Sequence, residues 1–484
     1  MKKVFLFLLL VICSLISFSV YAGENEPIIL WNSSYNSGYE DKAQAVAVDG
    51  EGNAYITGFS DNAGSNDYFR TIKYNSAGDT TYNITPILLT TDCRANGIAI
   101  DSSGNAFITG YILAGNNDFI TKGYDPNKSI IFSASYNSSQ LDEANAITID
   151  SSGNVYVAGF SYNGSNDDFR IIKYNSSGDT ILNFIYDSSF LDRANAIAVD
   201  SSHNIYVAGY SNNGSNDDFR IIKYNSVGDT IWNRTYNSGN ADIAFGITLD
   251  AQGNVYVAGT SNDGVTDNMR LIKYNSSGDL TWNKTFDSGN RDDGRSVAVD
   301  KYGYIYIAGI SGTANRDMRI IKYDPSGTIV WNIVYDSGGH DDAYGIAVDN
   351  SGNFYVVGDS FGSGNFDFRL IKYKLQYSDV VPPVTTGEVK IGSSNGDGIA
   401  HPGENIIIKF KPTEAGKITA KIYTLSGIFV KELPAYDSSG PNDYNNVMTW
   451  ACDNADSAKV ASGIYVLNIQ GPGINLIKKI AIVR

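Results

Sequence analysis

The chain has 484 residues, of which 42% are hydrophobic and 18% are charged, so it is long enough for two or more folded domains. It carries 36 Lys and Arg against 52 Asp and Glu, a formal net charge of −16. This balance argues against nucleic acid or an anionic membrane as the partner, because both are negatively charged surfaces.

The N-terminus is predicted to be a signal peptide over residues 1–22. Two lysines precede an apolar run from Val4 to Val20, and Ala22 supplies the small residue for cleavage. The alternative is a membrane anchor, but the run is shorter than the roughly 20 apolar residues that a spanning helix needs. We therefore expect a protein without a membrane span, secreted or held on the outer surface of a bacterium.

A unit of about 50 residues repeats seven times between residues 28 and 376. In every unit an apolar strand ends in aspartate: Asp49, Asp101, Asp150, Asp200, Asp250, Asp300 and Asp349. Each unit is predicted to form four short strands, called A to D here, such as 147–150, 155–159, 169–174 and 230–233. No segment of comparable length shows a helical period, so the fold class is all-β.

The strand count predicts how the repeats are arranged. Seven copies of strands A to C are followed by only six copies of strand D, and a lone strand D motif, Ile29–Asn32, precedes the first unit. This displacement is useful if the N-terminal strand completes the last sheet, because that closes a ring and leaves no open edges between the first and last units. The sequence therefore predicts a seven-bladed β-propeller whose last blade is closed by the N-terminal strand.

The repeated motifs resemble a known family. Asp-x-x-Gly-Asn-x-Tyr-Val-x-Gly, then Asp-Phe-x-x-x-Lys-Tyr and Gly-x-x-x-Trp, resemble the bacterial SBBP β-propeller repeats over residues 28–376. The resemblance implies an extracellular or surface protein without an assigned reaction.

A second domain is predicted after a proline-containing linker over residues 377–403. Residues 404–484 contain short strands separated by Pro, Gly and Asp, as expected for an Ig-like β-sandwich. Ala420–Gly427, Trp450 and Val460–Tyr465 resemble the FlgD-type Ig-like fold and the sorting domains of type IX secretion. The resemblance implies tethering or sorting through the secretion machinery or the cell surface.

Few residues offer chemistry. His203, His340 and His401 are dispersed, and Cys93 and Cys452 fall in different domains, so neither a histidine cluster nor a disulfide framework is expected. No cofactor is predicted. Calcium is the one metal for which a loop offers spaced oxygen ligands: Asn395, Asp397 and Glu404.

Two aspartate series recur with the blades. The first precedes strand A, with Asp92 beside Cys93 in the second unit: Asp41, Asp92, Asp142, Asp192, Asp242, Asp292 and Asp341. The second precedes strand C: Asp67, Asp118, Asp168, Asp218, Asp267, Asp317 and Asp367. Both are expected on one face of the disc, with the first series nearer the channel as candidate ligand-binding residues.

A structural interpretation of the aspartates is favoured over ligand binding. Arginines recur on strand C with the same period, and an Asp–Arg pair in every blade would belong to the blade itself: Arg70, Arg170, Arg220, Arg270, Arg319 and Arg369. The second unit breaks this pattern with Cys93 and Ile120, which marks it either as the place for a specific site or as drift in a tolerant repeat.

The function expected from these features is binding. The propeller would present a face to an extracellular glycan, peptide or protein, and the sandwich would tether or sort it. One alternative is an extracellular propeller enzyme, a polysaccharide lyase or glycosidase, which needs paired carboxylates with a His, Tyr or Arg. Another is a passive structural protein of the envelope.

Overall fold

The structure is a computed structural model that describes residues 25–61, 66–84, 91–362, 364–376, 389–393, 399–400, 405–410, 416–424, 429–438, 447–452, 463–471 and 474–482. All regular structure in these residues is β-strand, and two compact units form, a propeller over Glu26–Leu375 and a C-terminal unit from Gln376 onward. No helix in this part of the chain is long and apolar enough to cross a membrane. The predicted signal peptide lies outside the described residues.

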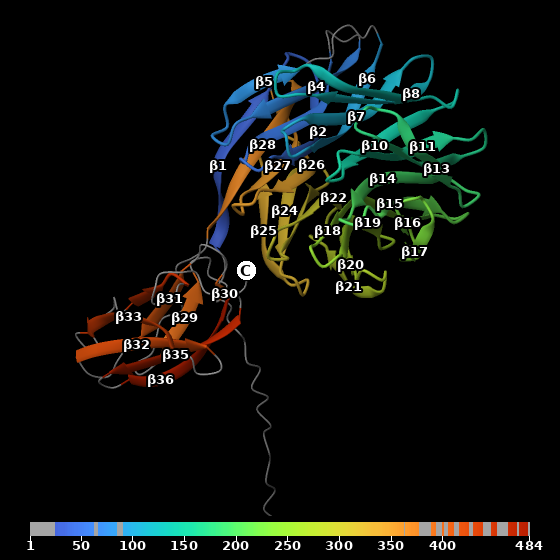
Figure 1. Cartoon of the computed structure of the whole chain (residues 1–484). Helices are drawn as coiled ribbons and strands as arrows, with labels where there is room; N and C mark the ends of the chain where they lie inside the picture. Colours follow the sequence, from blue (N-terminus) through green and yellow to red (C-terminus); the bar gives the residue numbers. More distant parts are fainter. Residues whose placement is uncertain are drawn as a thin grey trace, which may run out of the picture. The chain divides into compact units, whose positions relative to one another are not determined.

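The propeller consists of seven four-stranded sheets, or blades (Figure 1). Strand A of each blade lines the central channel. Blade 1 contains β2 (Asp41–Val48), β3 (Ala54–Asp61), β4 (Asp67–Tyr74) and β5 (Thr80–Ile84). Blade 2 contains β6 (Cys93–Ile100), β7 (Ala106–Leu113), β8 (Asn117–Tyr124) and β9 (Ile130–Tyr136). Blade 3 contains β10 (Asp142–Ile149), β11 (Val155–Tyr162), β12 (Asp167–Tyr174) and β13 (Thr180–Tyr186). Blade 4 contains β14 (Asp192–Val199), β15 (Ile205–Asn212), β16 (Asp217–Tyr224) and β17 (Thr230–Tyr236).

The remaining blades follow the same plan. Blade 5 contains β18 (Asp242–Leu249), β19 (Val255–Asn262), β20 (Asp267–Tyr274) and β21 (Leu280–Phe286). Blade 6 contains β22 (Asp292–Val299), β23 (Ile305–Ser311), β24 (Asp317–Tyr323) and β25 (Ile329–Tyr335). Blade 7 contains β26 (Asp341–Val348), β27 (Phe354–Gly362), β28 (Asn365–Gln376) and the N-terminal strand β1 (Asn25–Tyr35).

The N-terminal strand closes the ring. β1 is hydrogen-bonded to β28 at the edge of blade 7, which confirms the predicted strand exchange. Trp31 of β1 lies between the first and last blades, with its ring centroid 6.2 Å from that of Tyr74 in blade 1 and 6.1 Å from that of Tyr355 in blade 7. Its indole N–H donates to the carbonyl of Ser76 at 3.2 Å.

Neighbouring blades share their hydrophobic cores. Between blades 4 and 5, Tyr206 and Trp232 pack with Tyr274 and with aliphatic residues from both sheets. The same kind of cluster joins blade 7 to blade 1, where Ile56 meets Phe368. Burial of these side chains supplies the hydrophobic stabilisation that holds the ring together.

The turn between strands A and B explains the repeated Asp-x-x-Gly-Asn motif. The carboxylate of Asp150 accepts the backbone N–H groups of Ser152 and Asn154 at 2.9 and 3.0 Å, and the hydroxyl of Tyr156 donates to it at 2.8 Å. Gly153 has φ +79°, a left-handed conformation that favours glycine. His203 takes this place in blade 4 with φ +62°.

Every blade contains a β-bulge in strand A. In blade 3 the register shifts between Ala144 and Ala146, so that Asn145 has no partner on strand B. Opposite the bulge, a Cβ on Gly159 would overlap the carbonyl oxygen of Glu143, so only glycine fits there. The bulged residues of blades 1 to 7 are Gln44, Asn96, Asn145, Asn195, Phe245, Arg295 and Tyr344.

The C-terminal unit contains two sheets. One has the order β29 (Val389–Ser393), β31 (Ile406–Phe410), β34 (Val447–Trp450). The other has the order β30 (Ile399–Ala400), β36 (Ile474–Ile482), β35 (Gly463–Gly471), β32 (Gly416–Thr424), β33 (Phe429–Ser438). β29 and β30 fall within the segment 377–403 that the sequence analysis assigns to the linker, so strand pairing in this unit begins earlier than expected.

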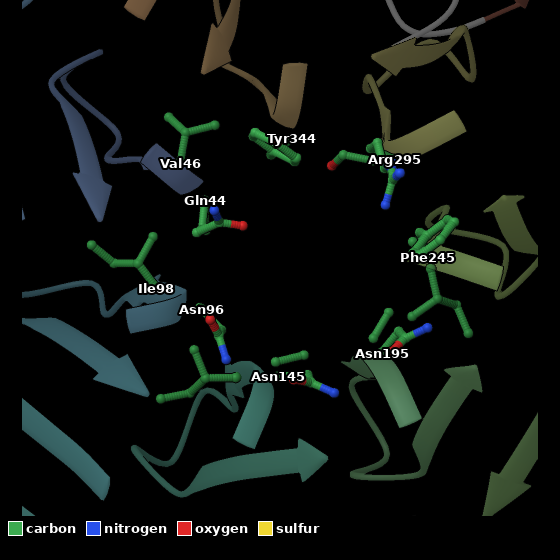
Figure 2. Close-up of a pocket in the computed structure, with 18 of the residues that line it drawn as sticks. Gln44, Val46, Asn96, Ile98, Asn145, Asn195, Phe245, Arg295 and Tyr344 are labelled. Atoms are coloured by element: carbon green, nitrogen blue, oxygen red, sulfur yellow. The ribbon is translucent and has the colours of Figure 1, made fainter. Parts of the chain in front are cut away.

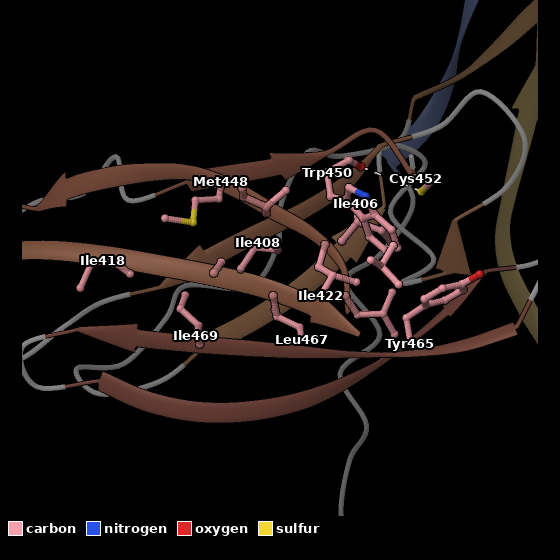
Figure 3. Packing of buried hydrophobic residues seen from close by; sticks show 14 residues of the cluster. Ile406, Ile408, Ile418, Ile422, Met448, Trp450, Cys452, Tyr465, Leu467 and Ile469 are labelled. Carbon is pink, nitrogen blue, oxygen red and sulfur yellow. Dashed lines mark hydrogen bonds between the residues drawn. The ribbon is translucent and has the colours of Figure 1, made fainter. Parts of the chain in front are cut away.

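A buried cluster joins the two C-terminal sheets (Figure 3). Ile406 and Ile408 alternate with more exposed residues along β31, and they pack with Leu467 and Ile469 of β35. Trp450 is fully buried at one end of the cluster. This arrangement fits a β-sandwich.

Candidate functional site

The seven bulged side chains surround the central channel and point into it (Figure 2). They line a cavity of ≈ 390 Å³ at the end of the channel where the A strands begin, and four further side chains complete its wall: Phe59, Arg94, Tyr111 and Glu143. We call this cavity the channel mouth. A second, smaller cavity of ≈ 180 Å³ lies farther along the channel, where aliphatic side chains such as Val46 and Ile98 join the lining. A bulge re-aims a side chain, which explains why these residues reach the channel.

One arc of the mouth is made of asparagines. Each donates its side-chain N–H to a backbone carbonyl of the next blade: Asn96 to Ala144 at 2.9 Å, Asn145 to Ala194 at 2.8 Å, and Asn195 to Ala244 at 2.9 Å. These side chains tie blades 2 to 5 together and present polar amides to the cavity.

The opposite arc departs from this pattern with Phe245, Arg295 and Tyr344. The guanidinium carbon of Arg295 lies 4.3 Å from the centre of the Phe245 ring, and its Nη2 donates to Asp293 at 2.9 Å. The Nε of Arg295 is buried and has no hydrogen-bond partner among the described residues. The hydroxyl of Tyr344 donates to Asp342 at 3.3 Å. This arc therefore combines two aromatic faces with a guanidinium.

A buried carboxyl pair supports the second arc. Asp342 and Asp359 face each other across β26 and β27, and Asp342 is paired with Arg316 at 2.7 Å. Asp359 is fully buried, and neither of its oxygens has a hydrogen-bond partner among the described residues. Burial, reinforced by the charge of Asp342, raises the pKa of Asp359 to about 8. This carboxyl is therefore mostly protonated at neutral pH.

The first aspartate series lies at the start of the A strands, as predicted, but away from solvent. Six members are fully buried: Asp41, Asp142, Asp192, Asp242, Asp292 and Asp341. Each accepts the backbone N–H of the serine four residues earlier, such as Ser188 to Asp192 at 2.7 Å. Asp92 is half-buried and accepts the N–H of Asp67 at 3.0 Å. These contacts give the series a structural role, and its assignment to ligand binding stays a prediction.

The expected Asp–Arg pair is replaced by a serine relay. In blade 4, Arg220 donates from Nε to Ser211 at 3.0 Å, and Ser211 is hydrogen-bonded to Asp192. The guanidinium also donates to Asn233 at 3.2 Å and lies 5.4 Å from the ring centre of Tyr186 in the preceding blade. The prediction of a direct Asp–Arg ion pair was wrong, because it gave no role to the serine whose hydroxyl lies between the carboxylate and the guanidinium.

Blade 2 replaces the whole relay at once. Cys93, Ile112 and Ile120 stand where the other blades have Asp, Ser and Arg, and Cys93 faces Ile112 across the strand pair. Cys93 is fully buried, and burial raises the pKa of its thiol to about 11, so it is neutral at physiological pH. A buried ionic network can be replaced by apolar residues when all its members change together, and this explains why blade 2 packs Cys93, Ile112 and Ile120 in place of Asp, Ser and Arg.

The bulged residues were missed by the sequence analysis, which weighed residues common to all blades. Two signals point to them. A glycine recurs in the interior of every strand B, which is typical of a bulge on the facing strand. The bulged position also varies more between blades than its neighbours do. The predicted calcium ligands Asn395, Asp397 and Glu404 lie outside the described residues.

Comparison with known families finds propeller repeats. The SBBP family, described as a beta-propeller repeat, matches residues 87–118 and 189–215. A second family, described as a domain of unknown function (DUF5122) beta-propeller, matches residues 151–180 and 204–230. All four segments lie within the propeller. No curated protein matches the chain.

Solved structures similar to this chain have low sequence identity to it. PorZ of Porphyromonas gingivalis, described as an essential bacterial surface component of the type-IX secretion system, is 12% identical with a TM-score of 0.43; the match covers 91% of this chain and 59% of PorZ. A protein of unknown function from Dyadobacter fermentans is 11% identical, with coverage of 73% and 98% and a TM-score of 0.43. The propeller domain of the Trilobed protease from Pyrococcus furiosus, described as having an open velcro topology, is 11% identical, with coverage of 71% and 98% and a TM-score of 0.44.

Proposed function

We propose that this protein is a secreted or cell-surface binding protein that holds an extracellular glycan in the channel mouth. The observation that carries the proposal is the ring of bulged residues, because the blades differ there and at the residue two positions earlier, while the other positions of strand A hold the same or similar residues in nearly every blade. The ring faces a cavity of ≈ 390 Å³, which lies within the usual range for small-molecule sites.

The chemistry of the mouth suits a sugar. A pyranose presents an apolar face of C–H groups and a rim of hydroxyls, so it needs both flat and hydrogen-bonding partners. Phe245 and Tyr344 supply aromatic faces. Asn145, Asn195 and Glu143 bring amide and carboxylate groups to the same cavity. A peptide or protein ligand would use the same groups, and it is the alternative within this function.

The rest of the chain supports an extracellular setting for this proposal. The predicted signal peptide would direct export, and the C-terminal unit would tether or sort the propeller, as its sequence resemblance to FlgD-type and type IX sorting domains implies. The described residues that line the channel mouth belong to the propeller.

A glycan array with the processed chain, residues 23–484, tests the proposal. We expect Tyr344→Asn and Phe245→Asn to weaken binding of the retained glycan at least tenfold without changing the Tm, since asparagine occupies this position in three other blades. Val227→Asn, at a 65% exposed turn outside the cavity lining, is the matched control and should bind like the parent. Absence of any retained glycan, or equal binding by all variants, would contradict the proposal.

A propeller enzyme remains the second candidate because of one observation. The protonated carboxyl of Asp359 lies beside Asp342, which is hydrogen-bonded to Tyr344 at the mouth, and two carboxyl groups with a raised pKa on one of them are a pattern found in glycosidases. Incubation with polysaccharides distinguishes the two functions. Product formation that Asp359→Asn abolishes would establish catalysis, whereas binding without product supports the binding function.

A further inference from the structure

Three side chains recur at six of the seven junctions between neighbouring blades; the junction of blades 1 and 2 has Cys93 in place of the aspartate. They are the residue near the start of strand C, the residue just after strand D, and the aspartate that opens strand A of the next blade. We call each set a junction triad. The triads in the described residues are Asp367–Asn36–Asp41, Asp118–Asn137–Asp142, Asp168–Asp187–Asp192, Asp218–Asn237–Asp242, Asn268–Asp287–Asp292 and Asp317–Asp336–Asp341.

Four of these triads contain two carboxylates and one amide. In three of them the middle asparagine donates to the strand C aspartate: Asn36 to Asp367 at 3.1 Å, Asn137 to Asp118 at 2.8 Å, and Asn237 to Asp218 at 3.1 Å. In the fourth, the middle residue is Asp287 and the strand C residue is Asn268 instead. The amide thus changes place, but the count of two negative charges is kept.

Two triads contain three carboxylates and no amide. One oxygen from each of Asp168, Asp187 and Asp192 lies within 4.8 Å of the other two, and the same holds for Asp317, Asp336 and Asp341. Burial and then the neighbouring carboxylates raise the pKa of Asp168 and of Asp317. Three negative charges at this spacing repel one another strongly in a partly buried site.

In the first of these triads, one carboxylate oxygen of Asp168 is buried without a hydrogen-bond donor in the part of the chain that the structure describes. The residue is only 2% exposed, and its Oδ1 is buried without a hydrogen-bond partner among the described residues, while Oδ2 accepts from Asn163. Within the described ranges, Asp317 of the other three-carboxylate triad also has an unpartnered Oδ1. The same holds for three aspartates whose triads carry one negative charge fewer: Asp118, Asp218 and Asp367. A buried, unpartnered oxygen next to two further carboxylates calls for a cation.

The donor set indicates which cation. Oxygens up to 4.8 Å apart fit around an ion that binds each at 2.3–2.6 Å, which is the range for Ca²⁺, and water can complete its coordination on the exposed side at Asp187. No histidine or cysteine belongs to either triad, which disfavours zinc. We propose that the triad Asp168–Asp187–Asp192 binds Ca²⁺ between blades 3 and 4, and that Asp317–Asp336–Asp341 does so between blades 6 and 7.

The first site is the stronger of the two. Arg319 and His340 both lower the pKa of Asp317, and Arg170 lowers the pKa of Asp168. Arg170 donates to Ser161 at 3.1 Å and to Asn183 at 3.0 Å. Arg319 donates in the same way to Ser311 at 3.1 Å and to Asn332 at 2.7 Å, so His340 is the difference between the two sites. Ca²⁺ should therefore fill Asp168–Asp187–Asp192 at lower concentration.

Calorimetric titration of the processed chain with CaCl₂, and thermal unfolding in 10 mM CaCl₂, 10 mM MgCl₂ or EDTA, test this inference. We expect two Ca²⁺ per chain with submillimolar to millimolar Kd and a Tm that rises by several degrees in Ca²⁺ but not in Mg²⁺. Asp187→Asn should remove the tighter site and Asp336→Asn the weaker one. Both variants should fold, because asparagine is the native middle residue of three other triads.

The reverse substitution sharpens the test. Asn137→Asp would give the triad of Asp118 and Asp142 a third carboxylate, and we expect one additional Ca²⁺ per chain. No heat of binding and no Ca²⁺-dependent change in Tm at 10 mM would overturn the inference. So would Ca²⁺ binding that Asp187→Asn and Asp336→Asn leave unchanged, since the ion would then be held elsewhere in the chain.

Discussion

Two positions on strand A, three residues apart, behave in opposite ways. The first is an aspartate in six of seven blades, and there it is fully buried and hydrogen-bonded to its own blade. The second is the bulged residue, which is Gln, Asn, Phe, Arg or Tyr and faces the channel. The comparison teaches that, in this repeat protein, the uniform position is one that a blade needs in order to fold, whereas the variable position is free to differ and is where the proposed ligand would bind.

The largest expected effect comes from breaking the uniform position. Asp242→Ala leaves the N–H of Ser238 and the relay through Ser261 without their acceptor, and we expect a loss of about 3–5 kcal/mol in the free energy of unfolding. Phe245→Asn on the same strand should change it by less than about 1 kcal/mol. Urea unfolding followed by tryptophan fluorescence measures both, and equal losses would remove the distinction between the two positions.

The second prediction introduces the aspartate of strand A into blade 2, which lacks the serine and the arginine of the relay. Cys93→Asp restores the aspartate found in the other blades, yet Ile112 and Ile120 offer it neither a hydroxyl nor a guanidinium. We expect a loss of about 2–3 kcal/mol, because a buried carboxylate without partners is costly. Adding Ile112→Ser and Ile120→Arg should recover much of it. A stable single variant would show that the aspartate does not need the relay.

The smallest effect tests a buried acid behind the variable ring. Asp359→Ile copies the residue of blade 6, Ile310, and should raise the free energy of unfolding at pH 4 by about 1–2 kcal/mol, because it removes a buried carboxyl without hydrogen-bond partners in the described part of the chain. The pKa of Asp359 is raised to about 8 in the folded chain, so between about pH 4 and pH 8 the unfolded state ionises while the folded state keeps its proton. Rising pH therefore destabilises the parent relative to the variant over this interval.

Urea unfolding of the parent and the variant at pH 4, 6, 7 and 9 measures this difference. It should widen from pH 4 to pH 8 and stay constant above. A difference that does not change with pH would mean that Asp359 titrates normally.

The fold could be predicted because its signals are local and repeated. Seven aspartate-ended strands gave the number of blades, and the lone Trp31 motif predicted which strand completes the last sheet. The channel mouth could not be predicted in the same way. A bulge changes the direction of the side chains at and after it, so the direction of Phe245 or Tyr344 depends on how strand A pairs with strand B. The alternation of apolar and polar residues along one strand does not reveal this pairing.

The relay escaped prediction for another reason. Asp192 and Arg220 recur with the same period, and opposite charges with a shared period suggest a direct pair. The structure places Ser211 between them, and a serine among many serines carries no signal of its own. The junction triads differ from the relay in this respect. The exchange of Asn for Asp after strand D can be read in the sequence, but its consequence is clear only from the structure, which brings the three side chains together.

Closure by β1 also sets the order in which the molecule can fold. Asn32 and Arg369 are hydrogen-bonded across 337 residues, so the first strand of the propeller to be synthesised pairs with the last one. Contacts of such long separation form slowly, and six blades can assemble from neighbouring segments before this one is completed. Until blade 7 has folded, β1 has no strand to pair with, and blade 1 lacks the packing of Tyr355 and Phe368 from blade 7. A chain that ends at any earlier blade would therefore leave the edges of its first and last blades uncovered, and proteases should cleave it more readily than the closed ring.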